Sequence, residues 1–394
     1  SVGLQVSSAS TLEISGTGSL YCKADADAGI GGTLGDDDPG HGAITIKSGN
    51  IIAESNTGAG IGGATGDNGE NITITGGTVT ATSVSGDGIG SGASSTTASK
   101  NIVIDGGSVK ASGAKAISIT PKNKAGSDVA MFQLKNQSAV NTIKIDNTSY
   151  TLNGFHPSDT SYYLYMTKAD HTITRGSNTY NVLWDATNSI FKLKAPTPSA
   201  PTTAVTVNSI TVTAPSNTST YGAAKYSLDK KTWQTSNVFS NLKAGTNYTI
   251  YVKYSGSGDY GESDAASKTV KTLDASYTVT VPQTMTAGGT SQNIAVGTSF
   301  EVGYGGQVNV KVKSGMDSAG IMPLTRTTGS TTTSISTQFK VGGSNFTNTS
   351  INVATFKNKT DSAAISFGAP TYSSGTIPAG DYSGTVTFEI SYTQ

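Results

Sequence analysis

The sequence predicts an all-β protein: a short right-handed parallel β-helix with a β cap, followed by two β-sandwich domains. Three features of the 394 residues lead to this prediction: a glycine-rich block that recurs near the N-terminus, a proline-rich break, and close-spaced alternating apolar residues elsewhere. The composition agrees, because Thr, Ser, Asn, Gly and Val dominate while long charged helix formers are rare.

The recurring block reads Ala-Gly-Ile-Gly-Gly or a variant of it. Copies stand at residues 28–32, 59–63, 87–92 and, in degenerate form, 115–118. The central isoleucines, separated by 31, 28 and 28 residues, are Ile30, Ile61, Ile89 and Ile117. A fixed period of this length is typical of a solenoid, in which each repeat forms one coil.

Two further apolar blocks, separated by a glycine corner, follow each copy. The first stands at residues 43–46, 71–74 and 101–104, the second at 50–53, 78–81 and 108–111, and an incomplete leading copy lies at 12–14 and 20–22. Three short strands per period describe one coil of a parallel β-helix whose coils stack about 4.8 Å apart. We therefore expect Ile74 to be buried between Ile46 and Ile104.

The single cysteine, Cys22, aligns with three small inward-facing positions, Ala53, Ala81 and Ala111. A buried, unreactive thiol is the prediction. One cysteine also excludes an internal disulfide framework and a cysteine-based zinc site.

The rest of the chain divides by composition. The predicted segments are 1–120 for the β-helix, 121–193 for a β-rich cap or subdomain, 194–203 for a linker, 204–274 for a fibronectin III-like sandwich and 275–394 for a C-terminal sandwich. A cap is expected because an open β-helix end exposes backbone groups. The linker contains three prolines in ten residues, which makes it semi-rigid and extended.

The segment 204–274 looks like a fibronectin type III module in its run 242–248, Leu-Lys-Ala-Gly-Thr-Asn-Tyr. Tyr248 stands where that fold has its tyrosine corner. The early-strand tryptophan of such modules is absent, and Trp233 lies in the middle instead.

The repeats resemble those of large secreted and cell-surface proteins of Gram-positive, mostly Firmicutes-type, bacteria. The likeness covers about residues 10–120, and Ser161-Tyr162-Tyr163-Leu164-Tyr165 matches a Tyr-Leu-Tyr strand that follows such repeats. The ending, 379–392, resembles the C-terminal β-sandwich modules of Gram-positive surface and pilus-like proteins. The resemblance implies a surface-associated β-helix and no defined activity.

The acidic loop at 35–42 invites a search for chemistry, because β-helices often host polysaccharide lyases and hydrolases. Its Asp-Asp and Gly-His-Gly resemble pieces of the polygalacturonase signature, but here both lie in one loop and the arginine motif is missing. A solvated turn is the main interpretation. The weaker alternative is a site for calcium or another cation held by Asp36, Asp37 and Asp38, with Asp67 or Glu70 of the loop stacked below as a further ligand. We otherwise expect no cofactor and no catalytic residue.

Aromatic residues gather in the segment expected to form the cap. The candidate ligand-binding residues are Tyr162, Tyr163, Tyr165 and Trp184. Successive residues of a strand face opposite sides, so the run Tyr162–Tyr165 must turn some rings outward or against another part of the protein. Packing of these rings in the core of the cap is the main interpretation, and ligand binding is the alternative.

The balance of 26 basic and 26 acidic residues excludes an overall nucleic-acid-binding character, and no apolar run is long enough to span a membrane. The favoured function is a non-enzymatic extracellular or cell-surface adhesin that binds a glycan or a surface receptor through the loop edge of the coils or the cap. The alternatives are a carbohydrate-active enzyme and a structural subunit of a surface layer, filament or phage-like particle. A structural subunit would self-assemble through the C-terminal domain.

Overall fold

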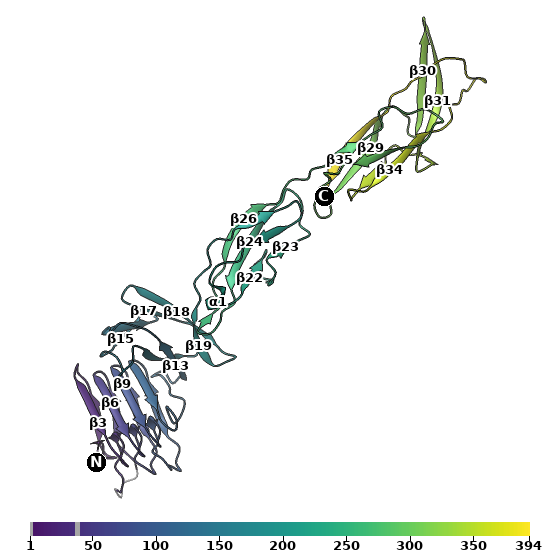
Figure 1. Cartoon of the computed structure of the whole chain (residues 1–394). Coiled ribbons are helices and arrows are strands. Elements are labelled where there is room, and N and C mark those ends of the chain that lie inside the picture. The colour runs from purple at the N-terminus through teal and green to yellow at the C-terminus, as the bar shows by residue number, and fades with distance from the viewer. Residues whose placement is uncertain (1–2, 36–39) are drawn as a thin grey trace. The chain divides into compact units, whose positions relative to one another are not determined.

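The computed structural model of the chain, drawn in Figure 1, describes residues 3–35 and 40–394. It confirms the all-β class: the described residues hold one four-residue helix, α1 (Thr218–Tyr221), and are otherwise strands and loops. The chain divides into two compact units. The first comprises residues 1–196, 219–221 and 255–263, and the second comprises 197–218, 222–254 and 264–394.

Three parallel four-stranded sheets form a β-solenoid of about four turns, which confirms the predicted β-helix. The first sheet, at the Gly-Ile corner, consists of β1 (Leu4–Gln5), β4 (Ile30–Gly31), β7 (Ile61–Gly62) and β10 (Ile89–Gly90). The second consists of β2 (Thr11–Ile14), β5 (Ala43–Ile46), β8 (Glu70–Ile74) and β11 (Lys100–Ile104). The third consists of β3 (Ser19–Lys23), β6 (Asn50–Ser55), β9 (Thr78–Ser83) and β12 (Ser108–Ser112).

The register of the coils agrees with the alignment of the repeats. Ile74 lies between Ile46 and Ile104, and its side chain is 0% exposed. Cys22 is buried and pairs with Ala53 on the next coil. The corner isoleucines also stack coil on coil, in the order Ile30, Ile61, Ile89 and Ile117. Apolar burial along these ladders is the main stabilising term of the solenoid.

Glycine is required at the Gly-Ile corner because the coils approach there without side chains. Gly62 has φ +140°, and a Cβ on it would lie 2.1 Å from the Gly90 carbonyl oxygen. Near the start of strands β8 and β11, Asn71 and Asn101 also have positive φ, 56° and 54°. The Asn101 Nδ2 donates to Asn71 Oδ1 at 3.0 Å, which links the third and fourth coils.

Beyond the coils, antiparallel strands follow in the same unit. One pair is β13 (Val129–Leu134) with β16 (Tyr162–Thr167). A six-stranded sheet has the order β15 (Thr148–Thr151), β14 (Thr142–Ile145), β17 (His171–Arg175), β18 (Asn178–Asp185), β19 (Ile190–Lys194) and β25 (Tyr260–Gly261). Strand β16 lies against β12, so these strands rest on the last full coil. They are called the cap below.

The second unit begins with two three-stranded sheets around an apolar core. One sheet has the order β20 (Thr203–Val205), β21 (Ile210–Val212) and β23 (Val238–Phe239). The other has the order β22 (Ala224–Ser227), β24 (Asn247–Tyr254) and β26 (Ala266–Lys271). The Tyr248 hydroxyl accepts from the Lys243 N–H at 2.9 Å, the contact expected of a tyrosine corner.

The last sandwich has a six-stranded sheet and a three-stranded sheet. The larger has the order β27 (Val279–Thr280), β28 (Gln292–Val296), β34 (Ser362–Phe367), β31 (Thr331–Val341) and β30 (Ile321–Thr328), with β32 (Ser344–Asn345) beside β31. The smaller has the order β33 (Asn352–Phe356), β29 (Gln307–Ser314) and β35 (Thr387–Thr393). Phe339, Phe356 and Val310 are among the fully buried residues between them.

Candidate functional site

The cap covers part of the outward face of the third solenoid sheet, and a histidine fastens it there. His156 is 2% exposed and lies between hydroxyls of two successive coils. Its Nδ1 is 2.9 Å from Thr80 Oγ1, and its Nε2 is 2.7 Å from Ser108 Oγ. Small hydroxyl side chains at these outward positions leave room for the imidazole ring and satisfy both of its nitrogens. Thr80, Ser108 and His156 are called the joint.

An ion pair lies beside the joint. Lys110 Nζ is 2.6 Å from Asp159 Oδ2, and the Tyr163 hydroxyl donates to the same carboxylate at 2.7 Å. Burial alone would raise the pKa of Asp159, but the hydrogen bonds from Lys110 and Tyr163 outweigh it and hold that pKa well below its usual range. The hydrogen bond with Asp159 in turn raises the pKa of Lys110. Both groups are charged at neutral pH.

The Ser108–His156 contact has the distance of a nucleophile and its base, but its surroundings do not suit catalysis. Both residues are buried, and the second ring nitrogen of His156 faces the Thr80 hydroxyl where a triad would place a carboxylate. Burial, helped by Lys110, lowers the pKa of His156 to about 4. The imidazole is therefore neutral at neutral pH, and the joint fastens the cap to the solenoid.

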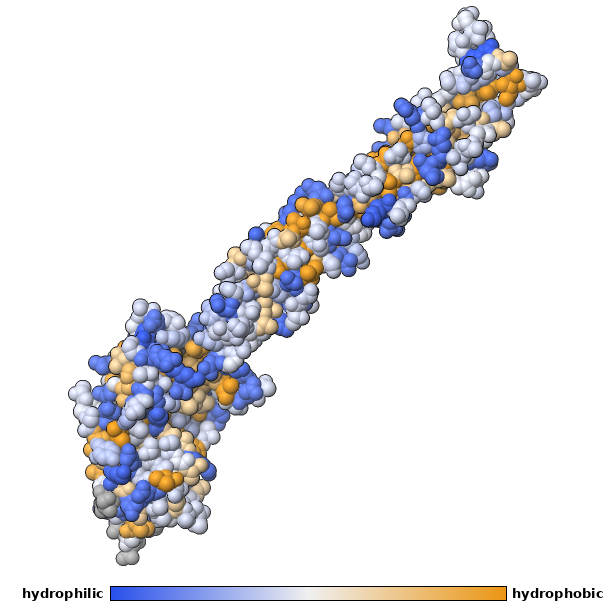
Figure 2. Space-filling view, viewed as in Figure 1, coloured by the Kyte–Doolittle hydropathy of each residue, from blue (hydrophilic) through white to orange (hydrophobic). Residues whose placement is uncertain are grey.

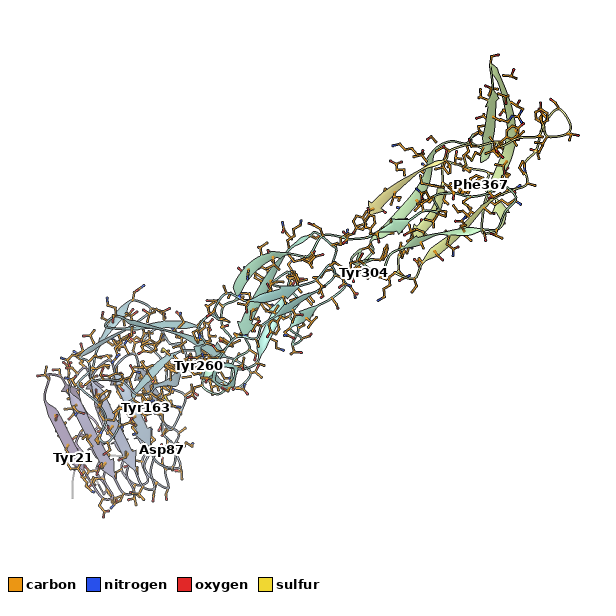
Figure 3. All side chains as sticks on the ribbon, turned by 45° about the horizontal axis from the view of Figure 1, so that its top comes forward. Tyr21, Asp87, Tyr163, Tyr260, Tyr304 and Phe367 are labelled. Carbon is orange, nitrogen blue, oxygen red and sulfur yellow. The ribbon has the colours of Figure 1, made fainter. Side chains whose placement is uncertain are left out.

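The part of the same sheet face around Tyr21 on the first coil is open. Tyr21 is 57% exposed, and its hydroxyl donates to Glu54 Oε2 at 2.9 Å. Lys23 Nζ lies 3.4 Å from that same oxygen, and the half-buried Ile52 is the strand partner of Tyr21. The hydrogen bond with Glu54 raises the pKa of Tyr21. Tyr21, Lys23, Ile52 and Glu54 are called the open face; Figure 3 shows Tyr21 on the first coil, away from Tyr163.

The structure shows where the candidate rings in the aromatic run of the cap lie. Tyr162 is fully buried in the cap core, and its hydroxyl accepts from the Val140 N–H at 2.9 Å, so its ring is out of reach of a ligand. Tyr165 packs against the solenoid core, and burial raises its pKa to about 12. Tyr163 contacts His156 edge to face, with ring centroids 5.2 Å apart. The outer side of the run thus meets the solenoid, one of the two outcomes that strand alternation allows.

Trp184, the fourth aromatic candidate, is half-buried in the cap. Its ring packs against Phe191 with centroids 4.8 Å apart, and its backbone N–H donates to Asp170 Oδ1. Tyr163, Tyr165 and Trp184 are each partly exposed, but Tyr165 packs against the solenoid core, and Tyr163 and Trp184 lie on different strands, β16 and β18.

The predicted calcium ligands fall partly outside the described residues, since Asp36, Asp37 and Asp38 all do. Asp67 and Glu70 lie near the buried His41, whose Nε2 accepts from the Glu70 N–H at 3.2 Å. The Glu70 carboxylate pairs with Lys100 at 2.8 Å, which occupies it. Within residues 3–35 and 40–394, no three His, Cys, Asp or Glu side chains converge as metal ligands.

A groove of about 710 Å³ lies in the last sandwich, beside the β30–β31 hairpin. Its walls include Met316, Asp317, Ile335 and Thr371, and no aromatic ring lines it. It is therefore a poor candidate for a sugar platform. No helix among the described residues is long and apolar enough to cross a membrane.

The open face and the joint were both missed by the sequence reasoning, although a signal existed for each. Tyr21 is the one aromatic residue within the repeats, at an outward position where later coils carry Ile52 and Thr80. The joint depends on His156, far from the coils in sequence. Only the hydroxyls that stand outward on the third and fourth coils hinted that something would cover them.

Comparisons with known proteins add little to this geometry. No family model and no curated protein matches the chain. One solved structure, described as a chaperone–tip adhesin complex vital for synergistic activation of CFA/I fimbriae biogenesis, matches 68% of this chain and 84% of its own at 12% identity and a TM-score of 0.20. A TM-score this low does not indicate a shared fold, so this match says nothing about the function of the chain. The fold alone defines the class: an all-β protein with a capped β-solenoid followed by sandwich domains.

Proposed function

We propose that this chain is a non-enzymatic, extracellular adhesin-like protein that binds a surface glycan through the open face of its solenoid. The observation that supports this most is Tyr21: a mostly exposed ring whose hydroxyl is held by Glu54 on the next coil. A ring fixed in this way loses little conformational freedom when a ligand stacks on it.

The groups around Tyr21 suit a sugar. Pyranose rings present an apolar C–H face and a rim of hydroxyls, so a binding site needs a flat ring with donors and acceptors beside it. The open face supplies the ring, the Glu54 carboxylate as acceptor and the Lys23 ammonium as donor. On the side of the first unit shown in Figure 2, polar and apolar residues are interspersed, which favours a polar ligand over an apolar partner.

The backbone beneath the open face is rigid. Behind Tyr21 and Ile52 lie the inward-facing Cys22 and Ala53, both buried in the solenoid core, and β3 pairs with β6 along its whole length. Side chains on such a sheet keep their spacing, so the ring, the carboxylate and the ammonium of the open face present a fixed arrangement to a glycan. The sandwich domains would then serve as spacers or assembly modules, and the binding needs neither a cofactor nor a bound metal.

The experiment is a glycan-array and mucin-binding screen of the whole chain beside two variants. Tyr21→Ala removes the exposed ring, and Tyr304→Ala removes a ring of matched exposure, 58%, from the second unit. We expect Tyr21→Ala to weaken binding at least about tenfold, the loss of roughly 1.4 kcal/mol, while Tyr304→Ala binds as the unchanged chain does. Equal binding by all three proteins would refute the open face as the site. Shortened glycan products after incubation would refute the non-enzymatic assignment.

A further inference from the structure

Strand β35 leaves one edge of the last sandwich unpaired. It is the outer strand of the sheet β33-β29-β35 and pairs with β29 from Thr387 to Thr393; within the described part of the chain no other strand joins it. In Figure 1 it is the yellow strand beside β29. An unpaired strand of this length presents a row of backbone donors and acceptors to another chain.

The side chains of β35 also leave apolar surface uncovered. Phe388, Ile390 and Tyr392 share the face that looks into the sandwich, opposite the core residues of β29. Phe388 and Tyr392 pack against that core, but Ile390 is 38% exposed although its partner Val310 is fully buried. Figure 2 shows apolar residues reaching the surface of this sandwich. A further strand beside β35 would cover Ile390.

Two other edge strands of this unit, β26 and β30, carry protection that β35 lacks. Edge strands are commonly blocked by lysine or proline. The edge strand β26 carries Lys268 and Lys271, and the edge strand β30 carries Pro323. Strand β35 has neither residue type, and its one charge, Glu389, lies opposite Lys311 of the neighbouring strand β29.

We propose that β35 pairs with β35 of a second copy of this chain, antiparallel, about a twofold axis at Ile390. The strand reads Thr-Phe-Glu-Ile-Ser-Tyr-Thr, which is nearly the same in both directions. Such a register matches Thr387 with Thr393, Phe388 with Tyr392, Glu389 with Ser391, and Ile390 with its own copy.

Each pair in this register is favourable or neutral. Threonine opposite threonine and aromatic opposite aromatic are stabilising cross-strand pairs, and no like charges meet, since Glu389 faces Ser391. A shift by two residues would set Phe388 against Ile390 and leave Tyr392 without a partner. The twofold symmetry is the kind most homodimers use, and two three-stranded sheets would become one of six strands. The assembly goes beyond glycan binding, since it would present two solenoid units together.

The first test is sedimentation velocity of the whole chain over a concentration series, beside Ile390→Lys and Ile377→Lys. Ile377 is a matched control, because it is 37% exposed on the same sandwich but lies outside β35. We expect a reversible dimer, a dissociation constant at least about tenfold weaker for Ile390→Lys, and no change for Ile377→Lys. A chain that stays monomeric throughout, or an Ile390→Lys variant that dimerises as before, overturns the proposal.

A second variant tests the register and does not rely on the fold tolerating Ile390→Lys. Ser391→Lys would place an ammonium opposite Glu389 of the second copy, twice per dimer. We expect tighter dimers at low salt and a loss of that gain at high salt. For any other partner or register, a lysine added to an edge strand should weaken association. Weaker dimers of Ser391→Lys therefore overturn the twofold register.

Discussion

The outward face of the third solenoid sheet has two halves with different roles. Over the third and fourth coils it carries the small hydroxyls of Thr80 and Ser108 and is covered by the cap through His156. Over the first and second coils it carries Tyr21 and Glu54, and the Tyr21 ring is mostly exposed. Both halves share one backbone and one register, so the difference lies in which side chains stand outward and what covers them.

This contrast separates two kinds of stability. The inward ladders repeat in every coil, so a change in one coil should disturb both halves of the face. The joint exists once and depends on a few polar contacts, so a change there should loosen the covered half and leave the open half intact.

The largest effect should come from Ile74→Asp, which places an unpaired charge among Ile46 and Ile104. We expect a loss of about 3–5 kcal/mol or more in the free energy of unfolding of the solenoid, measured by denaturant titration. Thr73→Asp is the matched control, because Thr73 faces outward on the same strand and is half-buried; its effect should be about 1 kcal/mol or less. An Ile74→Asp chain with unchanged unfolding would disprove the register of the coils.

Gly62→Ala should come next, since its Cβ would meet the backbone of the next coil at Gly90. We expect the free energy of unfolding of the solenoid to fall by about 3 kcal/mol, because alanine is strained at this φ and its Cβ forces the two coils apart. Gly66→Ala separates the two terms: Gly66 also has a positive φ, 91°, but no atom lies within 4 Å of its Cβ position. If both variants melt alike in a thermal scan, close coil contact at the corner is not what requires glycine.

Acid should loosen the covered half by protonating His156. Its folded pKa of about 4 lies below the ordinary value of 6.5, so the unfolded state binds the proton more readily and stability falls as the pH drops from about 6.5 to 4. The loss should reach about 2–3 kcal/mol. Amide hydrogen exchange should show protection falling at residues 153–163 while β3 and β6 keep theirs.

The control for this prediction is His41, the other buried histidine, whose pKa burial also lowers. His156→Asn should remove most of the pH dependence at the cap, and His41→Asn should not. Loss of protection in β3 and β6 at the same pH as in the cap would mean that the two halves do not behave separately.

The smallest effect should come from Tyr163→Phe, which removes one donor to Asp159. Since a single hydrogen bond to a charged group contributes modestly, we expect about 1–2 kcal/mol in thermal unfolding of the first unit. Tyr21→Phe also removes a donor to a carboxylate, but on the exposed side of the sheet, and should leave the melting temperature of the first unit unchanged. Equal losses would show that the covered half gains nothing from its burial.

The sequence predicts the repeating coils of the solenoid better than it predicts the cap, which occurs once. The coils were predictable because each position recurs in the sequence. The spacing of Ile30, Ile61 and Ile89 determines the register of the coils, and the burial of Cys22 follows from its alignment with Ala53. The cap was predicted only as a β-rich segment. The burial of Tyr162 and the contacts of His156 depend on residues that are far apart in the sequence. A periodic pattern does not predict such contacts.

The open face was missed for a different reason. Exposure of Tyr21 depends on where the cap ends, because the same outward row is covered at Thr80, two coils further on. The sequence shows which side chains point outward, but it does not show how many coils a separate segment will cover. The unpaired edge of β35 is similar, since strand alternation predicts its buried face but not its place at the side of a sheet.

The most direct test of the proposed function is tyrosine footprinting of the whole chain by oxidative labelling and mass spectrometry, with and without saturating soluble mucin. Tyr21 and Tyr304 are matched probes, exposed by 57% and 58% and lying in different units. We predict that mucin lowers labelling of Tyr21 at least about threefold and leaves Tyr304 unchanged, because a stacked sugar covers only the first ring. Unchanged labelling of Tyr21 at saturation, or protection of Tyr304 alone, would contradict binding at the open face.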